Sequence, residues 1–164
     1  YKIIDECSLD IDEEIELAEF IRSLQKPFLS TPFSLEAVDF LNEINISAFK
    51  IGSGECNHLP MIEKIAKTGK PVIMSTGMND IKSINRSYNI LKRNNLNVVL
   101  MHTTNIYPTP PHLVRLEAIR DIMVNCHTKN VGLSDHTINN IASFGAIALG
   151  AKIIERRAGR ETKK

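Results

Sequence analysis

The amino-acid sequence predicts an α/β fold organised around a parallel β-sheet. Apolar β-rich runs alternate with amphipathic helical patterns and recur every roughly 20–33 residues, the length of one strand–helix unit. The runs are apolar almost throughout, as expected for parallel strands covered on both faces. Polar or ionisable residues follow every run, where the active sites of such sheets lie. An eight-stranded barrel that lacks two units fits this pattern, and so does a doubly wound sheet.

Six segments have the length and composition of parallel strands. β-branched and long apolar residues dominate them, and turns or helical patterns bound each one. They cover residues 27–30, 48–51, 71–74, 98–101, 131–133 and 151–154.

Helices with recognisable ends are expected between these strands. The first covers residues 12–24. Ser34 is a good N-cap for the second, Pro60 suits the first turn of the third, and Gly69 ends it. Thr137 is expected to cap the last helix. The residues of that helix expected to face the core are Ile138, Ile141, Ala142, Gly145 and Leu149.

Composition and charge exclude several classes of protein. The 20 Lys and Arg residues nearly balance the 19 Asp and Glu residues, so no basic excess exists to attract nucleic acid or an anionic membrane. No apolar run approaches the ~20 residues of a membrane span. Cys7, Cys56 and Cys126 are too far apart for a CxxC pair, and reduced thiols in the cytoplasm are the simplest interpretation.

Candidate binding residues gather where the strands end. Lys50 lies within an apolar strand, and a phosphate or carboxylate would offset the burial of its ammonium group. A lysine that snorkels into water and a Schiff-base lysine are alternative interpretations. Gly52-Ser53-Gly54 and Ser75-Thr76-Gly77 offer hydroxyls and backbone N–H groups that can surround phosphate oxygens, although such sequences also form ordinary turns.

Other polar residues at the strand ends suit a metal or a sugar. His136 can bind a divalent metal as a neutral imidazole, or act as a hydrogen-bonded site histidine. His102 ends an apolar strand and suits the core as well as a site. Glu55 and Tyr107 are placed to hydrogen-bond sugar hydroxyls, and the prolines beside Tyr107 stiffen its loop.

Five motifs together resemble the N-acetylneuraminate (sialic acid) synthase family. They occur in the family's order and spacing, and the similarity extends from about Asp5 to Arg156. Any one motif could arise by chance, but five in register are specific. The motifs are Phe28-Leu-Ser-Thr-Pro-Phe33, Phe49-Lys-Ile-Gly-Ser-Gly-Glu55, Met74-Ser-Thr-Gly-Met78, His102-Thr-Thr-Asn-Ile-Tyr-Pro-Thr-Pro110 and Gly132-Leu-Ser-Asp-His-Thr137.

The resemblance implies a fold and a reaction. The fold is a (β/α)₈ TIM barrel of which this chain holds strands three to eight, so residues 1–156 would form a partial TIM-barrel synthase domain. The reaction is a manganese- or magnesium-dependent condensation of phosphoenolpyruvate with N-acetylmannosamine or a related N-acetylated amino sugar. Its products are a nine-carbon 3-deoxy ulosonic acid and phosphate. The complete protein is expected to be a cytoplasmic homodimer.

The resemblance also assigns roles to matching residues. Glu55 and Tyr107 match sugar contacts, and His136 matches one of two histidine ligands to the metal ion. Glu155 is expected near the metal and the attacking water, so Lys50, Glu55 and Glu155 are the candidate catalytic residues. The residues that match contacts to phosphoenolpyruvate are Thr31, Lys50, Ser53, Ser75, Asn105 and Ser134.

The sequence departs from the family pattern in three respects. Arg157 stands where the family has its second metal histidine, and its positive charge would repel a divalent ion. The first two strand–helix units and the carboxyl-terminal antifreeze-like domain have no counterpart here. Because Tyr1 is not a Met and the charged residues 157–164 directly follow an apolar strand, we expect a fragment whose atypical tail marks its edge.

Three alternatives to this function remain open. The first is a sibling synthase that acts on precursors of legionaminic or pseudaminic acid. The second is a Schiff-base aldolase built on Lys50. The third alternative is an inactive remnant that binds phosphate compounds or a partner chain.

Overall fold

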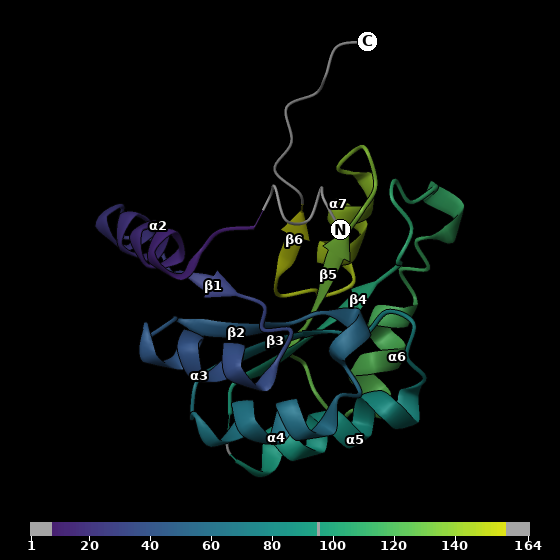
Figure 1. Ribbon diagram of the computed structural model, residues 1–164. Helices are drawn as coiled ribbons and strands as arrows, with labels where there is room; N and C mark the ends of the chain where they lie inside the picture. The colour runs from purple at the N-terminus through teal and green to yellow at the C-terminus, as the bar shows by residue number, and fades with distance from the viewer. Residues whose placement is uncertain (1–7, 95, 157–164) are drawn as a thin grey trace.

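The computed structural model describes residues 8–94 and 96–156. Its framework is a six-stranded parallel sheet whose strands neighbour one another in chain order (Figure 1). The strands are β1 (Leu29–Ser30), β2 (Ala48–Ile51), β3 (Val72–Ser75), β4 (Val98–Thr103), β5 (Val131–Asp135) and β6 (Ile154–Arg156). A doubly wound sheet reverses its strand order at a switch point, so this topology argues against that alternative. The predicted α/β class is confirmed.

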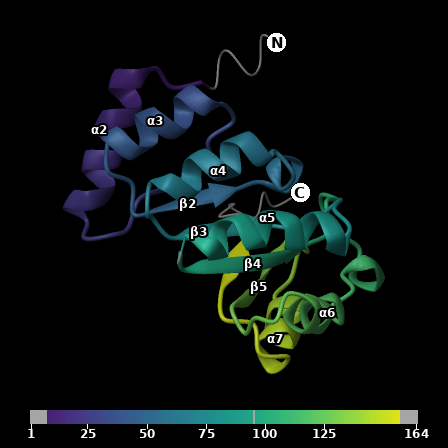
Figure 2. The same cartoon turned by 90° about the horizontal axis from the view of Figure 1, so that it is seen from below.

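The sheet is curled, and helices cover its convex side (Figure 2). They are α2 (Ile11–Ser23), α3 (Leu35–Glu43), α4 (Leu59–Lys67), α5 (Ile81–Arg93), α6 (Ala118–Asn125) and α7 (Ile141–Ala148), with short 3₁₀ turns η1 (Ser53–Glu55) and η2 (Pro111–Leu113). This architecture is a half-barrel, consistent with a partial TIM barrel. The numbering of the strands as three to eight stays a prediction, and residues 157–164, including Arg157, lie outside the described residues.

Side-chain caps fix the starts of three helices. The Asp10 carboxylate accepts the Glu13 amide hydrogen in a capping box that begins α2. Ser34 caps α3 as predicted, and Asp80 caps α5. Pro60 lies in the first turn of α4, where its missing N–H group costs no hydrogen bond.

The start of the last helix was predicted wrongly. α7 begins at Ile141, and residues 137–140 form an irregular loop. The Thr137 hydroxyl donates to the Asn139 carbonyl, and the Thr137 amide donates to the Asp135 carboxylate, so both groups are committed to the loop. Ile138 and Ile141 are 80% and 73% exposed rather than turned to the core. Local capping preference was overridden by tertiary contacts.

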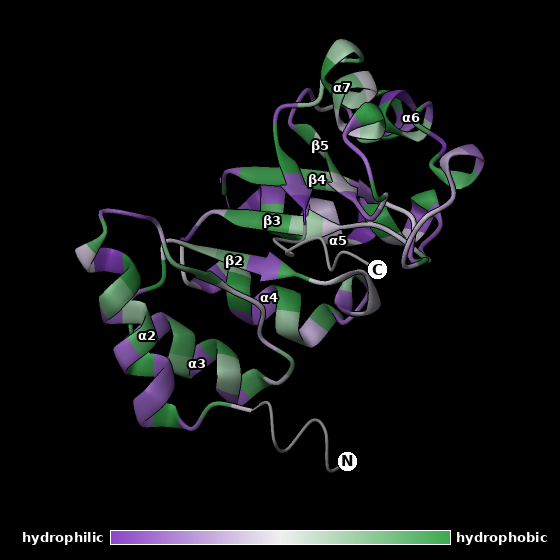
Figure 3. Ribbon diagram, turned by 90° about the horizontal axis from the view of Figure 1, so that it is seen from above, coloured by the Kyte–Doolittle hydropathy of each residue, from purple (hydrophilic) through white to green (hydrophobic). Residues whose placement is uncertain are grey.

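The hydrophobic core lies between the convex face of the sheet and the helices. β2 contributes Phe49 and Ile51, and α4 contributes Met61, Ile62 and Ile65, all fully buried. Each such side chain stabilises the fold by about 1.5–3 kcal/mol relative to its exposed state. Figure 3 shows hydrophobic stretches along β3 and β4, and helices with mixed surfaces. In residues 8–94 and 96–156, the helices lack the length and apolarity that a membrane crossing needs.

Candidate active site

The concave face of the sheet carries polar side chains near its carboxyl edge. The pairing register sets Thr103 opposite Ser134, and Ser134 opposite Glu155. Lys50 lies opposite the residue two positions before Ser75 on β3. Because alternate residues of a strand point to the same face, these five side chains share one side of the sheet. The parallel topology thus gathers residues that are far apart in the sequence.

Lys50 is the central cation of this face. Its ammonium group donates to the Ser75 hydroxyl and to the Glu155 carboxylate, each at 2.8 Å. The Lys50 side chain is only 15% exposed, so it does not snorkel into bulk water. Burial acts to raise the pKa of Glu155, but hydrogen bonds from Lys50 and Ser134 and the Lys50 charge outweigh it and lower that pKa. Glu155 is therefore ionised at neutral pH.

A cavity of about 410 Å³ opens over these groups. It is lined by Lys50, Ser53, Ser75, Thr103, Asn105, Tyr107, Ser134, His136, Glu155 and Arg156. Most of the site residues expected from the sequence are therefore brought together at one mouth. Hydroxyls, an amide and one ammonium make this cavity suited to a small anion.

Thr31 and Glu55 do not line the cavity. Thr31 follows β1, and its methyl group lies beside the backbone of Gly52. Glu55 belongs to η1, and its carboxylate is turned toward His58, with 3.2 Å between carboxylate oxygen and Nδ1. The two residues flank the cavity on the side of β1 and β2.

Asn79, which the sequence did not single out, and Gly77 both contact residues of the cavity. The Asn79 side-chain amide donates to the carbonyls of Ser53, at 2.8 Å, and Gly77, at 2.7 Å. A Cβ at Gly77 would lie 1.9 Å from Asn105 Oδ1 and 2.8 Å from the Thr103 carbonyl oxygen. Gly77 was part of a noted motif, but its tight contact with Asn105 had no sequence signal.

His136 faces the cavity beside Tyr107. The two rings stack with centroids 3.9 Å apart at 26°, and the Ser134 hydroxyl lies 3.3 Å from His136 Nε2. Burial, the largest contribution, lowers the pKa of His136, although the charges of Glu155 and Asp135 act in the opposite direction. The ring is therefore neutral at physiological pH, and its buried Nδ1 makes no hydrogen bond with the described residues.

The described residues do not form a complete metal site. Within 8–94 and 96–156, no group of three His, Cys, Asp or Glu side chains converges. His136 and Glu155 both line the cavity, so one neutral imidazole and one carboxylate are available. Neutral imidazole is a good ligand for a divalent ion, but these two residues do not complete a coordination shell.

Other reactive residues lie away from this chemistry. His102 is buried in the core, with Nε2 2.6 Å from the Val114 carbonyl oxygen, and burial lowers its pKa. Cys56 is fully buried, which raises the pKa of its thiol to about 12. A thiolate nucleophile at Cys56 is therefore not available.

Comparison with known proteins places these features in one family. The model of the family described as "NeuB family" matches residues 1–160. The chain is 40% identical to the N,N'-diacetyllegionaminic acid synthase of Campylobacter jejuni over 94% of its own length and 47% of the relative. It is 34% identical to the N-acetylneuraminate-9-phosphate synthase of Homo sapiens, over 88% of this chain and 40% of the relative.

A solved structure supports the same assignment. The N-acetylneuraminic acid synthetase of Leptospira borgpetersenii superposes with a TM-score of 0.85 at 27% identity, over 92% of this chain and 53% of that one. The chain thus spans about half the length of the relatives that it matches.

Proposed function

Because the chain belongs to the NeuB family, we propose that it is part of a synthase that condenses phosphoenolpyruvate with an N-acetylated amino sugar. C3 of phosphoenolpyruvate forms a bond to the aldehyde carbon of the open-chain sugar, whose oxygen takes up a proton. Water adds at C2, and inorganic phosphate leaves. The product is a nine-carbon 3-deoxy ulosonic acid.

The observation that carries this proposal is the setting of Lys50. Its ammonium group lies at the carboxyl edge of a parallel sheet, bonded to Ser75 and Glu155 within a cavity of about 410 Å³. Ser53, Asn105 and Ser134 surround the same space with groups that can hydrogen-bond phosphate or carboxylate oxygens. Thr31, at the flank, completes the set proposed to hold phosphoenolpyruvate.

The cavity also offers groups for the sugar and for the added water. Tyr107 lines it and presents a hydroxyl to a sugar, while Glu55 lies at the flank, two residues after Ser53 in η1. Glu155, ionised beside Lys50, is placed to accept a proton from water that attacks C2. The proposed catalytic groups are therefore Lys50, Glu55 and Glu155.

A divalent manganese or magnesium ion belongs to the proposal, with His136 as one ligand. Its neutral ring and unpartnered nitrogen fit that role, but the ligands that complete the site would come from outside the described residues. When bound, such an ion would polarise the sugar aldehyde as a Lewis acid. Arg157, which stands in place of a second histidine ligand, also lies outside the described residues.

The amino sugar that the full-length protein uses is a separate part of the proposal. Relatives of similar identity include a diacetyllegionaminic acid synthase and a pseudaminic acid synthase from Helicobacter pylori, besides the neuraminate enzymes. A sibling synthase is thus a candidate on equal terms with an N-acetylmannosamine-specific enzyme. A cytoplasmic homodimer is the proposed state of the full-length protein.

The test measures phosphoenolpyruvate binding by calorimetry in the full-length protein that carries this chain. Lys50→Ala is expected to weaken binding at least about thirtyfold, because it removes a largely buried charged partner of the anion. Lys64→Ala is the control, since Lys64 pairs with Asp39 at the surface. Unchanged affinity in Lys50→Ala would refute the assignment.

Product formation with a panel of N-acetylated amino sugars then separates the candidates. Phosphate release with one sugar names the substrate, and binding without turnover identifies an inactive phosphate-binding remnant. Borohydride trapping of Lys50 would identify a Schiff-base aldolase instead. In the structure the Lys50 nitrogen donates hydrogen bonds to Glu155 and Ser75, each at 2.8 Å, so a Schiff base at Lys50 would have to form at the expense of these contacts.

A further inference from the structure

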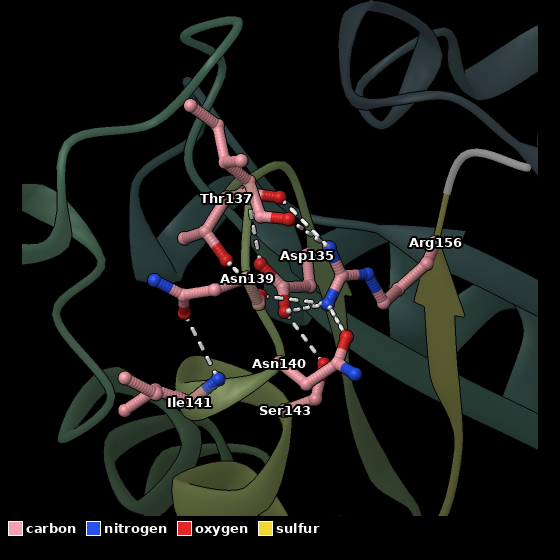
Figure 4. A network of polar contacts seen from close by, with 8 residues as sticks. Asp135, Thr137, Asn139, Asn140, Ile141, Ser143 and Arg156 are labelled. Atoms are coloured by element: carbon pink, nitrogen blue, oxygen red, sulfur yellow. Dashed lines mark hydrogen bonds and ion pairs between the residues drawn. The ribbon is translucent and has the colours of Figure 1, made fainter. Parts of the chain in front are cut away.

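The loop of residues 137–140, between His136 and α7, is attached to strand β6 by the side chain of one arginine. Arg156, the last residue of β6, donates to the carbonyls of Thr137 at 2.8 Å, Asn139 at 2.7 Å and Ile138 at 3.4 Å (Figure 4). It also donates to the side-chain oxygen of Asn140. A guanidinium group has five donors in a rigid fork, so one side chain can tie together a whole loop.

Asp135 anchors the same network from the sheet. Its side chain is fully buried, and its carboxylate accepts hydrogen bonds from the Thr137 amide at 2.8 Å and the Ser143 hydroxyl at 2.5 Å. Arg156 Nη1 lies 3.6 Å from the carboxylate, because the β5–β6 register sets the two residues opposite each other. The guanidinium group thus lies between a buried carboxylate and the loop.

Other bonds fix the shape of the loop rather than its place. The Thr137 hydroxyl bonds the Asn139 carbonyl, and the Asn139 side chain accepts the Ile141 amide hydrogen. Among the hydrogen bonds of the described part of the chain, those from Arg156 tie residues 137–140 to another strand. Loss of Arg156 would therefore leave the loop folded locally but loosely attached.

We infer that Arg156 is a positioning residue for His136, acting through a clamp made of Asp135, Ser143, Arg156 and residues 137–140. His136 directly precedes the clamped loop, and its carbonyl accepts the Thr109 amide hydrogen at 2.9 Å. Its ring must stay stacked on Tyr107 and close to Ser134 to face the cavity. A shift of the loop would turn the imidazole away from the substrate space. Where it concerns turnover, this inference rests on the proposed function.

Arg156 itself lines the cavity, so a direct contact with substrate is the competing explanation. Ser143 separates the two. Its hydroxyl supports Asp135 from α7 and does not line the cavity. A clamp predicts that Ser143→Ala speeds hydrogen–deuterium exchange around His136 and lowers kcat, as the Arg156 variants do. A direct contact of Arg156 with substrate predicts that Ser143→Ala has no effect on either quantity.

The first measurement is hydrogen–deuterium exchange of residues 136–143 in the full-length protein. Arg156→Lys and Arg156→Ala should both speed exchange at least about tenfold, since an ammonium keeps the charge but cannot bridge several acceptors. Arg115→Ala is the control, because the Arg115 side chain pairs with Glu117 at the exposed surface. Unchanged protection in the Arg156 variants overturns the clamp. This readout needs no activity, so it stands even if the proposed reaction is wrong.

The second measurement is steady-state kinetics with phosphoenolpyruvate and the best amino sugar of the panel. Positioning predicts that Arg156→Lys lowers kcat about tenfold or more and leaves the KM for phosphoenolpyruvate within about twofold. Ser143→Ala should lower kcat by a smaller factor. Added guanidinium ion should restore part of the kcat of Arg156→Ala, and ammonium ion should not. Fast exchange with unchanged kcat, or a rise confined to KM, refutes the positioning role.

Discussion

Two loops at the carboxyl edge of the sheet are held in place by different kinds of interaction. The loop after β3, residues 76–80, is held by close packing and neutral hydrogen bonds: Thr76 bonds the Met101 carbonyl, Asn79 bonds Ser53, and Gly77 lies against Asn105. The loop after β5, residues 136–140, is held by an ionic pair, Arg156 and Asp135.

The difference predicts which kind of substitution disturbs each loop most. The loop after β3 depends on shape, so added volume should disturb it more than lost charge. The loop after β5 depends on the buried Asp135 carboxylate and the Arg156 guanidinium group. Loss of Arg156 leaves a buried charge unpaired, and loss of Asp135 leaves hydrogen-bond donors without an acceptor. The loop after β5 presents His136 to the cavity, and the loop after β3 lies against two residues that line it, Ser53 and Asn105, so the cavity depends on two kinds of support.

The largest effect is expected from Asp135→Ala, which removes the buried half of the ionic loop. The substitution leaves the Thr137 amide and the Ser143 hydroxyl without an acceptor and takes the anion away from Arg156. We expect a loss of about 3 kcal/mol in the free energy of unfolding. Urea denaturation measures it, with Asp39→Ala at the surface expected to cost less than about 1 kcal/mol. Equal losses of stability in Asp135→Ala and Asp39→Ala would contradict the role of the buried carboxylate in the loop after β5.

A smaller effect is expected from Gly77→Ala, which adds volume to the packed loop. Its methyl group would meet Asn105 Oδ1 at 1.9 Å, so the Asn105 side chain must move. The KM for phosphoenolpyruvate should rise about tenfold, as for loss of one hydrogen bond to an anion. A double-mutant cycle with Asn105→Ala is the check. If the two KM effects multiply, Gly77 acts independently of Asn105 and the explanation is wrong.

The smallest effect concerns Asp80, which ends the packed loop and caps α5. The hydrogen bond from the Ser83 amide, the largest contribution, lowers the pKa of Asp80 below its ordinary 3.8. A lowered folded-state pKa means that the folded protein binds fewer protons, so this stabilisation is present above the ordinary pKa and is lost as pH falls. Asp80→Asn keeps a capping oxygen but does not titrate. Its unfolding midpoint in urea should fall less than that of the wild type between about pH 6 and pH 3. Parallel profiles would contradict the assignment.

The sequence predicted the scaffold of the site because its signals are local. Apolar runs located β1 to β5, with β2 at its observed limits, and Ser34 and Pro60 marked helix starts. The sixth strand was expected at 151–154 but lies at Ile154–Arg156. Parallel strands bring their carboxyl ends to one edge, so polar residues after each run were expected to converge. Lys50, Ser75, Asn105 and His136 do line one cavity.

The prediction failed where a distant partner decides the local structure. Thr137 has the side chain of an N-cap, yet Arg156, nineteen residues later in the chain, holds Thr137 in a loop. No local pattern indicated that the Glu55 carboxylate lies beside His58. The support that Asn79 and Gly77 give to Ser53 and Asn105 likewise depends on contacts across loops, which leave no periodic signal.

By itself, the sequence determined the family, the alternation of strands and helices and the chemical character of the cavity, because motifs and hydrophobic periodicity are encoded over a few neighbouring residues. Tertiary structure alone decided that Lys50 pairs with Glu155 and that Arg156 holds the loop of His136. The physical reason is that hydrogen bonds and ion pairs depend on distances of a few ångströms between residues whose sequence separation carries no such information.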